Sequence, residues 1–366
     1  MKKTIKLVLA LITSVSFLTS VHAGELKVTG TAKATYNITS GFGGAGSAHQ
    51  GKGIGVANEI DFGASGELDN GWTWNYQVQF DPGNTAASSG GSNGQVDDSQ
   101  LTLTTNLGTF GVFVSEGGLD VDNAASQSVY GRPTDIGIAT GMVDGPGIDS
   151  FNNIQYHSPA GLLPFGAQFK VAYASGQGST MNSTNAVGNA TDTYGTNAAQ
   201  YQLSVTPIEG LTVKADYYNE GGAKAYVVQQ FEAGSVAATY KSGPFGIGYS
   251  KTLRAPLIQA ASATTTVQTN TGTTGGNADA VRLYTSNKMS AAYAVNENFS
   301  ISYEREKSSR EKIVNATEYD ITSDAIQGAY TMGGMTIAVS HGQTDNVGYA
   351  NTDEVNQTLI AVTMAF

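Results

Sequence analysis

Cysteine is absent from all 366 residues, which excludes disulfides, thiolate metal sites and a cysteine nucleophile. Histidine occurs 4 times and proline 8 times, and charged residues make up only 13% of the chain. Acidic residues outnumber basic ones by 30 to 19, so a nucleic-acid partner is not expected. Glycine, by contrast, occurs 46 times and tyrosine 18 times, a composition more typical of strands and turns than of helices.

Long hydrophobic runs are also missing, apart from one stretch at the N-terminus. Three lysines precede an apolar run from Leu7 to Leu18, and the small-residue exit Val21-His22-Ala23 follows. This is the pattern of a cleavable secretory signal, and the run is shorter than the roughly 20 residues of a membrane-spanning helix. We therefore expect residues 1–23 to be a signal peptide and residues 24–366 to form one domain. Cleavage would leave 16 basic against 30 acidic residues.

Apolar and polar residues alternate with period two along much of the chain, which predicts strands whose two faces meet different environments. The clearest case joins Trp72, Trp74, Tyr76, Val78 and Phe80, with polar residues between them. Sixteen strands are predicted in this way: 25–39, 54–68, 72–80, 98–105, 109–115, 151–158, 165–175, 197–206, 211–219, 228–241, 245–254, 279–295, 299–306, 317–330, 335–342 and 355–366.

Short and long connections alternate between these predicted strands. The short ones, such as 69–71 and 242–244, are rich in turn residues, and the long ones are rich in Gly, Ser, Thr and Asn. An outer-membrane barrel has this pattern, with short periplasmic turns and long external loops. We therefore predict an all-β fold, an antiparallel transmembrane β-barrel of about 16 strands whose first and last strands pair. An open edge in hydrocarbon would leave backbone groups without hydrogen bonds.

The sequence of a soluble β-sandwich or β-helix would also alternate between apolar and polar residues. Periodicity alone does not show which face of the sheet is inside. A sandwich buries its apolar face, whereas a barrel in lipid turns that face outward. Aromatic residues near the short turns favour the barrel, since they would form a girdle at one membrane interface. These residues are Trp72, Phe110, Phe165, Tyr240, Phe245, Tyr293, Phe299 and Tyr330.

Parity also predicts which strand charges face water. If the apolar set faces lipid, the residues between them face the lumen, where a charge avoids a cost of roughly 2 to 4 kcal/mol at mid-bilayer. The predicted pore-wall residues are Lys33, Glu59, Asp61, Lys170, Lys214, Asp216, Arg282 and Lys288.

Two stretches resemble the general porins of Gram-negative outer membranes. One is Leu101 to Val114, LTLTTNLGTFGVFV, and the other is Asn153 to Tyr173, NIQYHSPAGLLPFGAQFKVAY. The resemblance implies passive diffusion of ions and small hydrophilic solutes through a water-filled pore. It also implies a homotrimer surrounded by outer-membrane lipid and lipopolysaccharide.

By the same resemblance, residues 116–150 correspond to a third loop that folds into the barrel and narrows the pore. This segment carries Glu116, Asp120, Asp122, Asp135, Asp144 and Asp149 against a single Arg132. The chain lacks the dense arginine cluster that family members carry on the opposite pore wall. The terminal strand, which ends at Phe366, resembles the C-terminal signal that the outer-membrane assembly machinery recognises in this family.

The sequence also bears on other possible functions. A barrel esterase is not favoured, because no Gly-x-Ser-x-Gly motif lies near His49, His157 or His341. The run Asp120-Val121-Asp122-Asn123 lacks the spacing of a calcium loop, although loop carboxylates could bind a divalent ion weakly. A substrate-specific channel for a sugar or other nutrient, and an adhesin or receptor role for the loops, stay open. No cofactor and no dedicated metal site are expected.

Overall fold

A computed structural model describes residues 26–43, 47–48, 51–80, 96–136, 140–175, 197–221, 227–262, 265–269, 281–313, 317–351 and 354–366. The predicted signal peptide, residues 1–23, lies outside the described residues. Sixteen long strands make up the main sheet. They are β1 (Leu26–Gly43), β3 (Gly51–Glu67), β4 (Thr73–Phe80), β5 (Val96–Thr105), β6 (Gly108–Val114), β7 (Asn153–His157), β8 (Gln168–Ser175), β9 (Asn197–Ile208), β10 (Leu211–Gly221), β12 (Glu232–Ser242), β13 (Phe245–Ala255), β16 (Val281–Ala294), β17 (Phe299–Lys312), β18 (Ile321–Met332), β19 (Met335–Asp345) and β20 (Glu354–Ala365).

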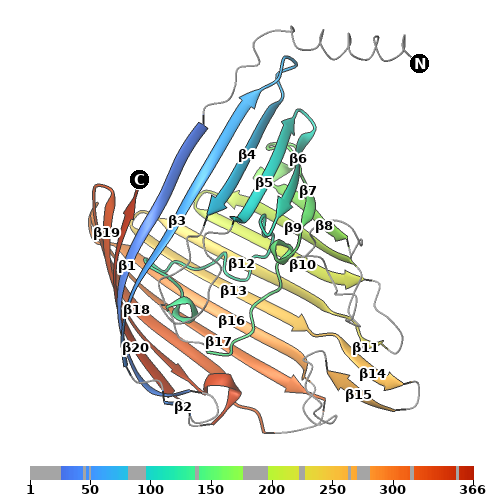
Figure 1. Cartoon of the computed structure of the whole chain (residues 1–366). Helices are drawn as coiled ribbons and strands as arrows, with labels where there is room; N and C mark the ends of the chain where they lie inside the picture. The colour runs from blue at the N-terminus through green and yellow to red at the C-terminus, as the bar shows by residue number, and fades with distance from the viewer. Residues whose placement is uncertain are drawn as a thin grey trace, which may run out of the picture.

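Each long strand pairs antiparallel with its neighbours in the chain, and the sheet closes on itself between β1 and β20 (Figure 1). The closing ladder runs from Thr31 opposite Ala365 to Gly41 opposite Val355. It is extended by the backbone of Phe366, which donates to the Gly30 carbonyl at 3.0 Å and accepts from the Gly30 amide at 2.9 Å. The predicted closed barrel is therefore confirmed.

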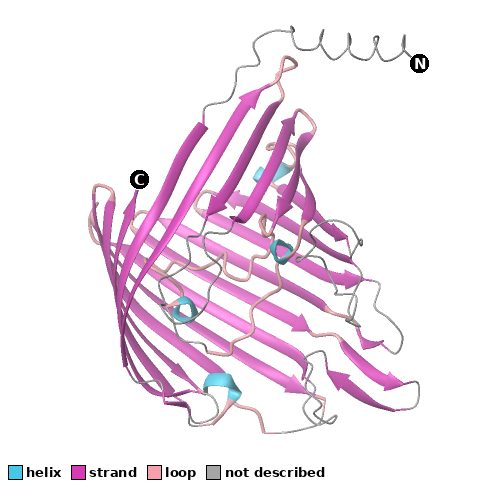
Figure 2. Ribbon diagram, viewed as in Figure 1, coloured by secondary structure: helices cyan, strands magenta, loops and turns pink. Residues whose placement is uncertain are grey.

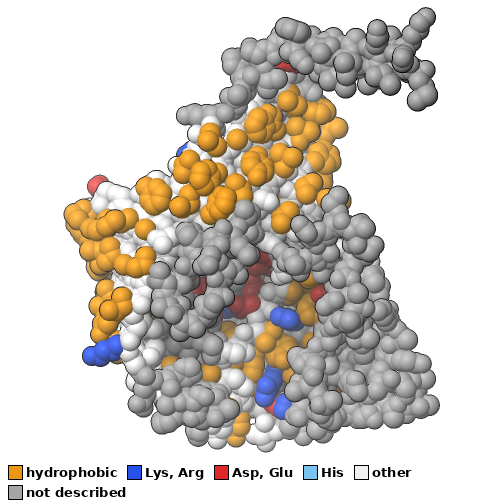
Figure 3. All heavy atoms as spheres, in the orientation of Figure 1, with side chains coloured by type: hydrophobic (Ala, Val, Ile, Leu, Met, Phe, Trp, Pro, Cys, Tyr) orange, Lys and Arg blue, Asp and Glu red, His pale blue; other side chains and the backbone are white. Residues whose placement is uncertain are grey.

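The barrel has its polar residues inside and its apolar residues outside. On β17, Ser302, Glu304, Glu306 and Ser308 are buried, and the intervening Ile301 and Tyr303 are exposed. The same alternation is clear on β9, β13, β18, β19 and β20, and Figure 3 shows apolar side chains over the outer flank with charged ones inside the central opening. A soluble sandwich would show the reverse, so this polarity identifies the apolar face as the lipid-facing one.

Several strand ends differ from the predicted ones. β17 continues six residues past the predicted end at 306, because charges on both faces of its second half hide the alternation. Residues 164–166 form a 3-10 turn, η3 (Pro164–Gly166), before β8 starts at Gln168. The segment predicted as one long loop after β13 contains β14 (Ile258–Ser262) and β15 (Thr265–Thr269), which form a small sheet with β11 (Val227–Gln229).

Short elements complete the fold. The two-residue strand β2 (Ser47–Ala48) pairs with the end of β1. In the described part of the chain, the helical turns are single 3-10 turns, namely η1 (Pro133–Asp135), η2 (Ile148–Ser150), η3 and η5 (Val347–Tyr349) (Figure 2). Among the described residues, no helix has the length and apolarity needed to cross a membrane.

Candidate functional site: a loop folded along the inner wall

The long connection between β6 and β7 runs along the inside of the barrel wall (Figure 1). On its outward path, the amide of Val121 donates to Asp216 on β10 at 3.2 Å. The amides of Gln127, Val129 and Tyr130 then donate to Ser290, Ser302 and Gln327, at 3.0, 3.0 and 3.1 Å. These acceptors lie on β16, β17 and β18, so inward-facing polar side chains of successive strands support the loop backbone.

The loop turns at η1 and comes back along the same wall. Ser286 on β16 donates to the Val143 carbonyl at 3.2 Å, and Arg254 on β13 donates to the Asp144 carbonyl at 3.0 Å. The amide of Ile148 donates to Gln200 on β9 at 2.9 Å. Both passes of the loop are therefore fixed to one side of the barrel.

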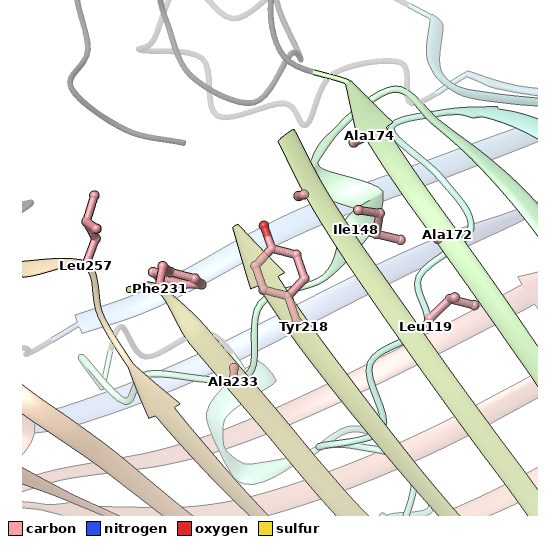
Figure 4. Close-up of a cluster of buried hydrophobic side chains, with 9 residues drawn as sticks. Leu119, Ile148, Ala172, Ala174, Tyr218, Phe231, Ala233 and Leu257 are labelled. Atoms are coloured by element: carbon pink, nitrogen blue, oxygen red, sulfur yellow. The ribbon is translucent and has the colours of Figure 1, made fainter. Parts of the chain in front are cut away.

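An apolar cluster fixes the two ends of the loop to β8–β12. Leu119 from the outward pass and Ile148 from the returning pass are almost completely buried against it. Figure 4 shows both side chains on the Ala172 side of Tyr218, whose ring contacts Phe231 on its other side. Burying these side chains stabilises the loop against the wall, at about 1.5 to 3 kcal/mol for each large apolar residue.

Lys288 on β16 is the centre of an ion-pair network beneath the middle of the loop. Its side chain is 4% exposed, and its Nζ lies 2.7 Å from Asp144 and 3.4 Å from Asp122. It also donates to Asn123. Burial opposes ionisation of Asp144, but Lys288 and Arg132 outweigh it and lower the pKa of that carboxyl.

Arg132 is the second cation of the network and comes from the loop itself. Its guanidinium lies 2.7 Å from Asp135, 3.3 Å from Asp144 and 3.4 Å from Glu306 on β17. Asp122, Arg132, Asp135, Asp144 and Lys288 were all predicted as pore residues, and the structure brings them into one connected group. Most of their charge is neutralised within that group.

Asp120 and Asp149 have a different environment. Among the described residues, no Lys or Arg forms an ion pair with either carboxylate. Burial raises the pKa of Asp120 to about 7, and the neighbouring Asp122 and Asp149 raise it too. Burial likewise raises the pKa of Asp149. A side-chain hydrogen bond with Asp122 also raises the pKa of Asp120.

Glu116 belongs to the start of the loop. The remaining predicted wall residues, apart from Arg282, lie near the loop or at inward-facing positions of their strands. The Glu116 carbonyl accepts from Asn153 on β7 at 3.1 Å. Lys33 on β1 lies over the ring of Tyr130, 5.7 Å from its centroid.

Lys170 lies opposite the inward-facing Gln202, and Lys214 lines a small pocket with Ala124 of the loop. Glu59 and Asp61 share an inward row on β3, where Gln77 donates to Asp61 at 3.2 Å.

Arg282 is the exception, and its predicted position on the pore wall is wrong. Its side chain is 59% exposed and pairs with Glu311 at 2.6 Å, and Glu311 shares the outward parity of Tyr303. The cause is a register shift between Val281 and Leu283, which reverses the parity at the external end of β16. Regular spacing in a sequence does not reveal such a bulge.

Glu304 and Glu306 on β17 are site residues that the sequence reasoning missed. Glu304 accepts hydrogen bonds from Ser126 at 2.5 Å and from Ser128 at 2.6 Å, and Glu306 accepts one from Thr134 at 2.7 Å. Both carboxylates are completely buried under the loop. Both residues lie within the predicted strand 299–306, so the parity set by Ile301 and Tyr303 could have identified them as inward-facing.

Metal binding by the loop carboxylates finds no support in the described part of the chain. No group of three or more His, Asp or Glu residues there has the arrangement of a metal site.

A family model described as Gram-negative porin matches residues 8–366. No curated protein sequence matches this chain. Among solved structures, the chain is similar to Salmonella typhi OmpF in complex with daunomycin, with a TM-score of 0.66, 14% identity, and 95% of this chain and 99% of that chain covered.

Two further structures show the same architecture. An anion-selective porin from Comamonas acidovorans has a TM-score of 0.64 at 12% identity, with 94% and 100% of the two chains covered. Vibrio cholerae OmpT, folded in vitro and in trimer form, has a TM-score of 0.61 at 13% identity, with the same coverage. At such low identity these likenesses show the fold alone.

Proposed function

Since this chain belongs to the Gram-negative porin family, we propose that residues 116–150 form the constriction that selects solutes in its pore. The chain is an outer-membrane β-barrel that forms a diffusion channel, and it is not an enzyme. The proposal rests on one observation: the loop is hydrogen-bonded along its length to the inward faces of β9–β18, inside the barrel.

The charges around the loop favour cations. Its six acids, together with Glu304 and Glu306 beneath it, outnumber the bases in contact with the loop, which are Lys33, Arg132, Lys214, Arg254 and Lys288. A lumen lined by one sign of charge raises the local concentration of counter-ions. We therefore expect a weakly cation-selective pore.

General diffusion fits the lumen better than a substrate-specific path. A sugar-specific channel needs exposed aromatic rings on which a solute can stack. The inward-facing rings of Tyr218, Phe231 and Tyr349 are at most 6% exposed, because they pack against neighbouring side chains. Tyr130 and Tyr284 are partly buried, and they contact Lys33 and Tyr349 respectively. We propose a homotrimer as the assembled form, supported by family membership and by the trimer form of the Vibrio cholerae relative.

Planar bilayers test the constriction directly. Asp120 and Asp149 are the carboxylates to neutralise, because Asp122, Asp135 and Asp144 hold Lys288 and Arg132, and their removal would loosen the loop. We expect ohmic pores, and a smaller cation preference in the Asp120→Asn/Asp149→Asn variant at a pH where both acids are ionised.

A matched control removes two acids from the short turns, as Asp69→Asn/Glu297→Gln, and should leave the reversal potential in a salt gradient unchanged. Equal reversal potentials for the wild type and the loop variant would contradict the constriction. Solute exclusion in proteoliposomes separates a general pore, which passes unrelated small solutes according to size, from a specific one.

A further inference from the structure

A small polar cavity lies between the loop and the wall that β10 and β12 form. Its volume is about 210 Å³, and its lining consists of Ala124 from the loop and Thr212, Lys214, Ala237 and Thr239 from the two strands. A water molecule has a share of about 30 Å³ in the liquid. The cavity therefore has room for a small polyatomic ion together with a few waters.

The cavity lies on the periplasmic side of the loop. Thr212 is the second residue of β10, directly after the short turn at 209–210, and Thr239 lies opposite it near the end of β12. The loop is held further along β10, where the Val121 amide donates to Asp216 at 3.2 Å. A solute that enters from outside therefore meets this cavity after it has passed the loop.

The polar groups of the cavity can all donate hydrogen bonds. Within the described ranges, the Lys214 ammonium forms no ion pair and no hydrogen bond, and the hydroxyls of Thr212 and Thr239 form no hydrogen bond. An ammonium offers three donors and each hydroxyl offers one. The cavity thus presents one positive charge and two neutral donors to whatever occupies it.

Two further bases face the same part of the lumen. Lys170 on β8 and Lys214 on β10 flank β9, with their backbones roughly 12 Å apart. Their ammonium groups are close enough to repel each other. Lys241 lies two residues past Thr239 on the same face of β12, at its periplasmic end. These bases make the approach to the cavity electropositive.

The acids of the surrounding elements do not compensate this charge. Asp216, two residues along β10, accepts hydrogen bonds from a loop amide and from Gln200, both at 3.2 Å. Asp122 of the loop is almost completely buried and lies 3.4 Å from Lys288. Glu209 is exposed in the short turn before β10. None of the five lining residues is acidic.

We propose that this cavity binds a small dianionic oxyanion, of which inorganic phosphate is the representative. Lys214 and the two threonine hydroxyls donate to its oxygens, and Lys170 and Lys241 attract it through the lumen. Phosphate is favoured over chloride because its several oxygens can accept from donors on both strands at once. The site adds an anion to a pore whose loop favours cations, and it goes beyond the selectivity proposed for the constriction.

Phosphorus NMR of the refolded full chain tests this site. Inorganic phosphate is titrated in a potassium chloride buffer, which screens non-specific attraction. Saturable broadening of its resonance then gives the dissociation constant. We expect Lys214→Gln to weaken phosphate binding at least about tenfold, since a charge-assisted hydrogen bond is lost. Thr212→Val/Thr239→Val keeps every charge, and we expect a loss of about tenfold from its two missing donors.

Matched controls come from other strands of the lumen wall. Lys27→Gln removes a base from β1, and Thr31→Val/Thr102→Val removes two hydroxyls from β1 and β5. Both controls should bind phosphate like the wild type.

Broadening that does not saturate in the wild type would overturn the proposal, even if Lys214→Gln failed to fold. Undiminished binding by Thr212→Val/Thr239→Val would also overturn it, because the anion would then respond only to the general field of the lumen. An equal loss in the controls would have the same meaning. Binding is measured without a current, so its outcome does not depend on the selectivity of the constriction.

Discussion

Lys288 holds the middle of the pore loop to the wall through a charge that water hardly reaches. Its side chain is 4% exposed, and that of its partner Asp122 is 1% exposed. Removing one member of a buried pair leaves the other charge without compensation, which costs more than the pair itself contributes. Lys288 therefore holds the loop against the wall, and its removal should first loosen the loop.

We expect Lys288→Met to lower the free energy of unfolding by about 3 kcal/mol, because Asp122 and Asp144 lose their common cation. Urea unfolding of the refolded barrel measures the change, and single-channel recordings should show a noisier open state. Lys241→Met, at an exposed strand end, is the control and should unfold like the wild type. A stable, quiet Lys288→Met channel would contradict the anchoring role.

Asp120 should give the pore a pH dependence near neutrality. Because its pKa is raised to about 7, the carboxyl gains a proton as the pH falls through that value, and the loop loses a negative charge. We expect the cation preference to decrease over this range and Asp120→Asn to remove the step. Reversal potentials recorded on both sides of pH 7 measure it. A step of the same size in Asp120→Asn would assign the titration to another group.

The Asp120 carboxyl also makes the stability of the fold depend on pH, in the opposite direction to an ordinary ion-paired carboxylate. The folded protein holds the Asp120 proton more tightly than the unfolded chain, whose pKa is the ordinary 3.8. Its contribution to stability is therefore fully present below pH 3.8 and is lost as the pH rises through about 7. We therefore expect the unfolding midpoint of the wild type, compared with that of Asp120→Asn, to fall as the pH rises through about 7.

At the scale of elements, the loop approaches β13 closely because Gly248 has no side chain. A Cβ at this position would clash with the Ala125 carbonyl of the loop. We expect Gly248→Val to push the loop away from the wall into the lumen and to reduce the single-channel conductance. Gly53→Val adds the same side chain where a Cβ meets no atom within 4 Å. An unchanged conductance in Gly248→Val would show that the loop does not narrow the path.

The closing strand pair gives Phe366 a structural role beside the predicted assembly signal. Deleting this residue removes two backbone hydrogen bonds to Gly30, whereas Phe366→Ala keeps them and removes the exposed ring. We expect the deletion to reduce the folded barrel at the cell surface more than Phe366→Ala does, with normal conductance in the channels that do form. Surface labelling and heat-modified mobility measure both effects. Wild-type surface levels of the deletion variant would contradict this prediction.

Strand number, parity and closure could be predicted because alternation repeats sixteen times and hydrocarbon penalises an open edge. Two kinds of detail could not. The bulge at Val281 and Leu283 reverses the parity of Arg282 without any local sequence signal. The path of the loop depends on side chains far away in the chain, such as Ser302 and Gln327, which have ordinary polar identities. The acids of the loop were visible in the sequence, but their division between paired and unpaired groups was not.

For the whole molecule, selectivity depends on the balance between the acidic loop and the basic residues elsewhere on the lumen wall. Lys170 and Lys214 face the lumen on β8 and β10, and among the described residues neither forms an ion pair with an acid. They therefore oppose the field of the loop, whereas Lys288 and Arg132 are already neutralised within their network.

We expect Lys170→Gln/Lys214→Gln to increase the cation preference and to leave the single-channel conductance at high salt nearly unchanged, since screening removes the field there. Reversal potentials at low and high salt measure both effects. The control Lys241→Gln/Lys251→Gln removes two exposed bases outside the constriction and should match the wild type. If cation preference instead stayed constant in the wall variant, the selectivity would come from the loop alone, without an opposing wall field.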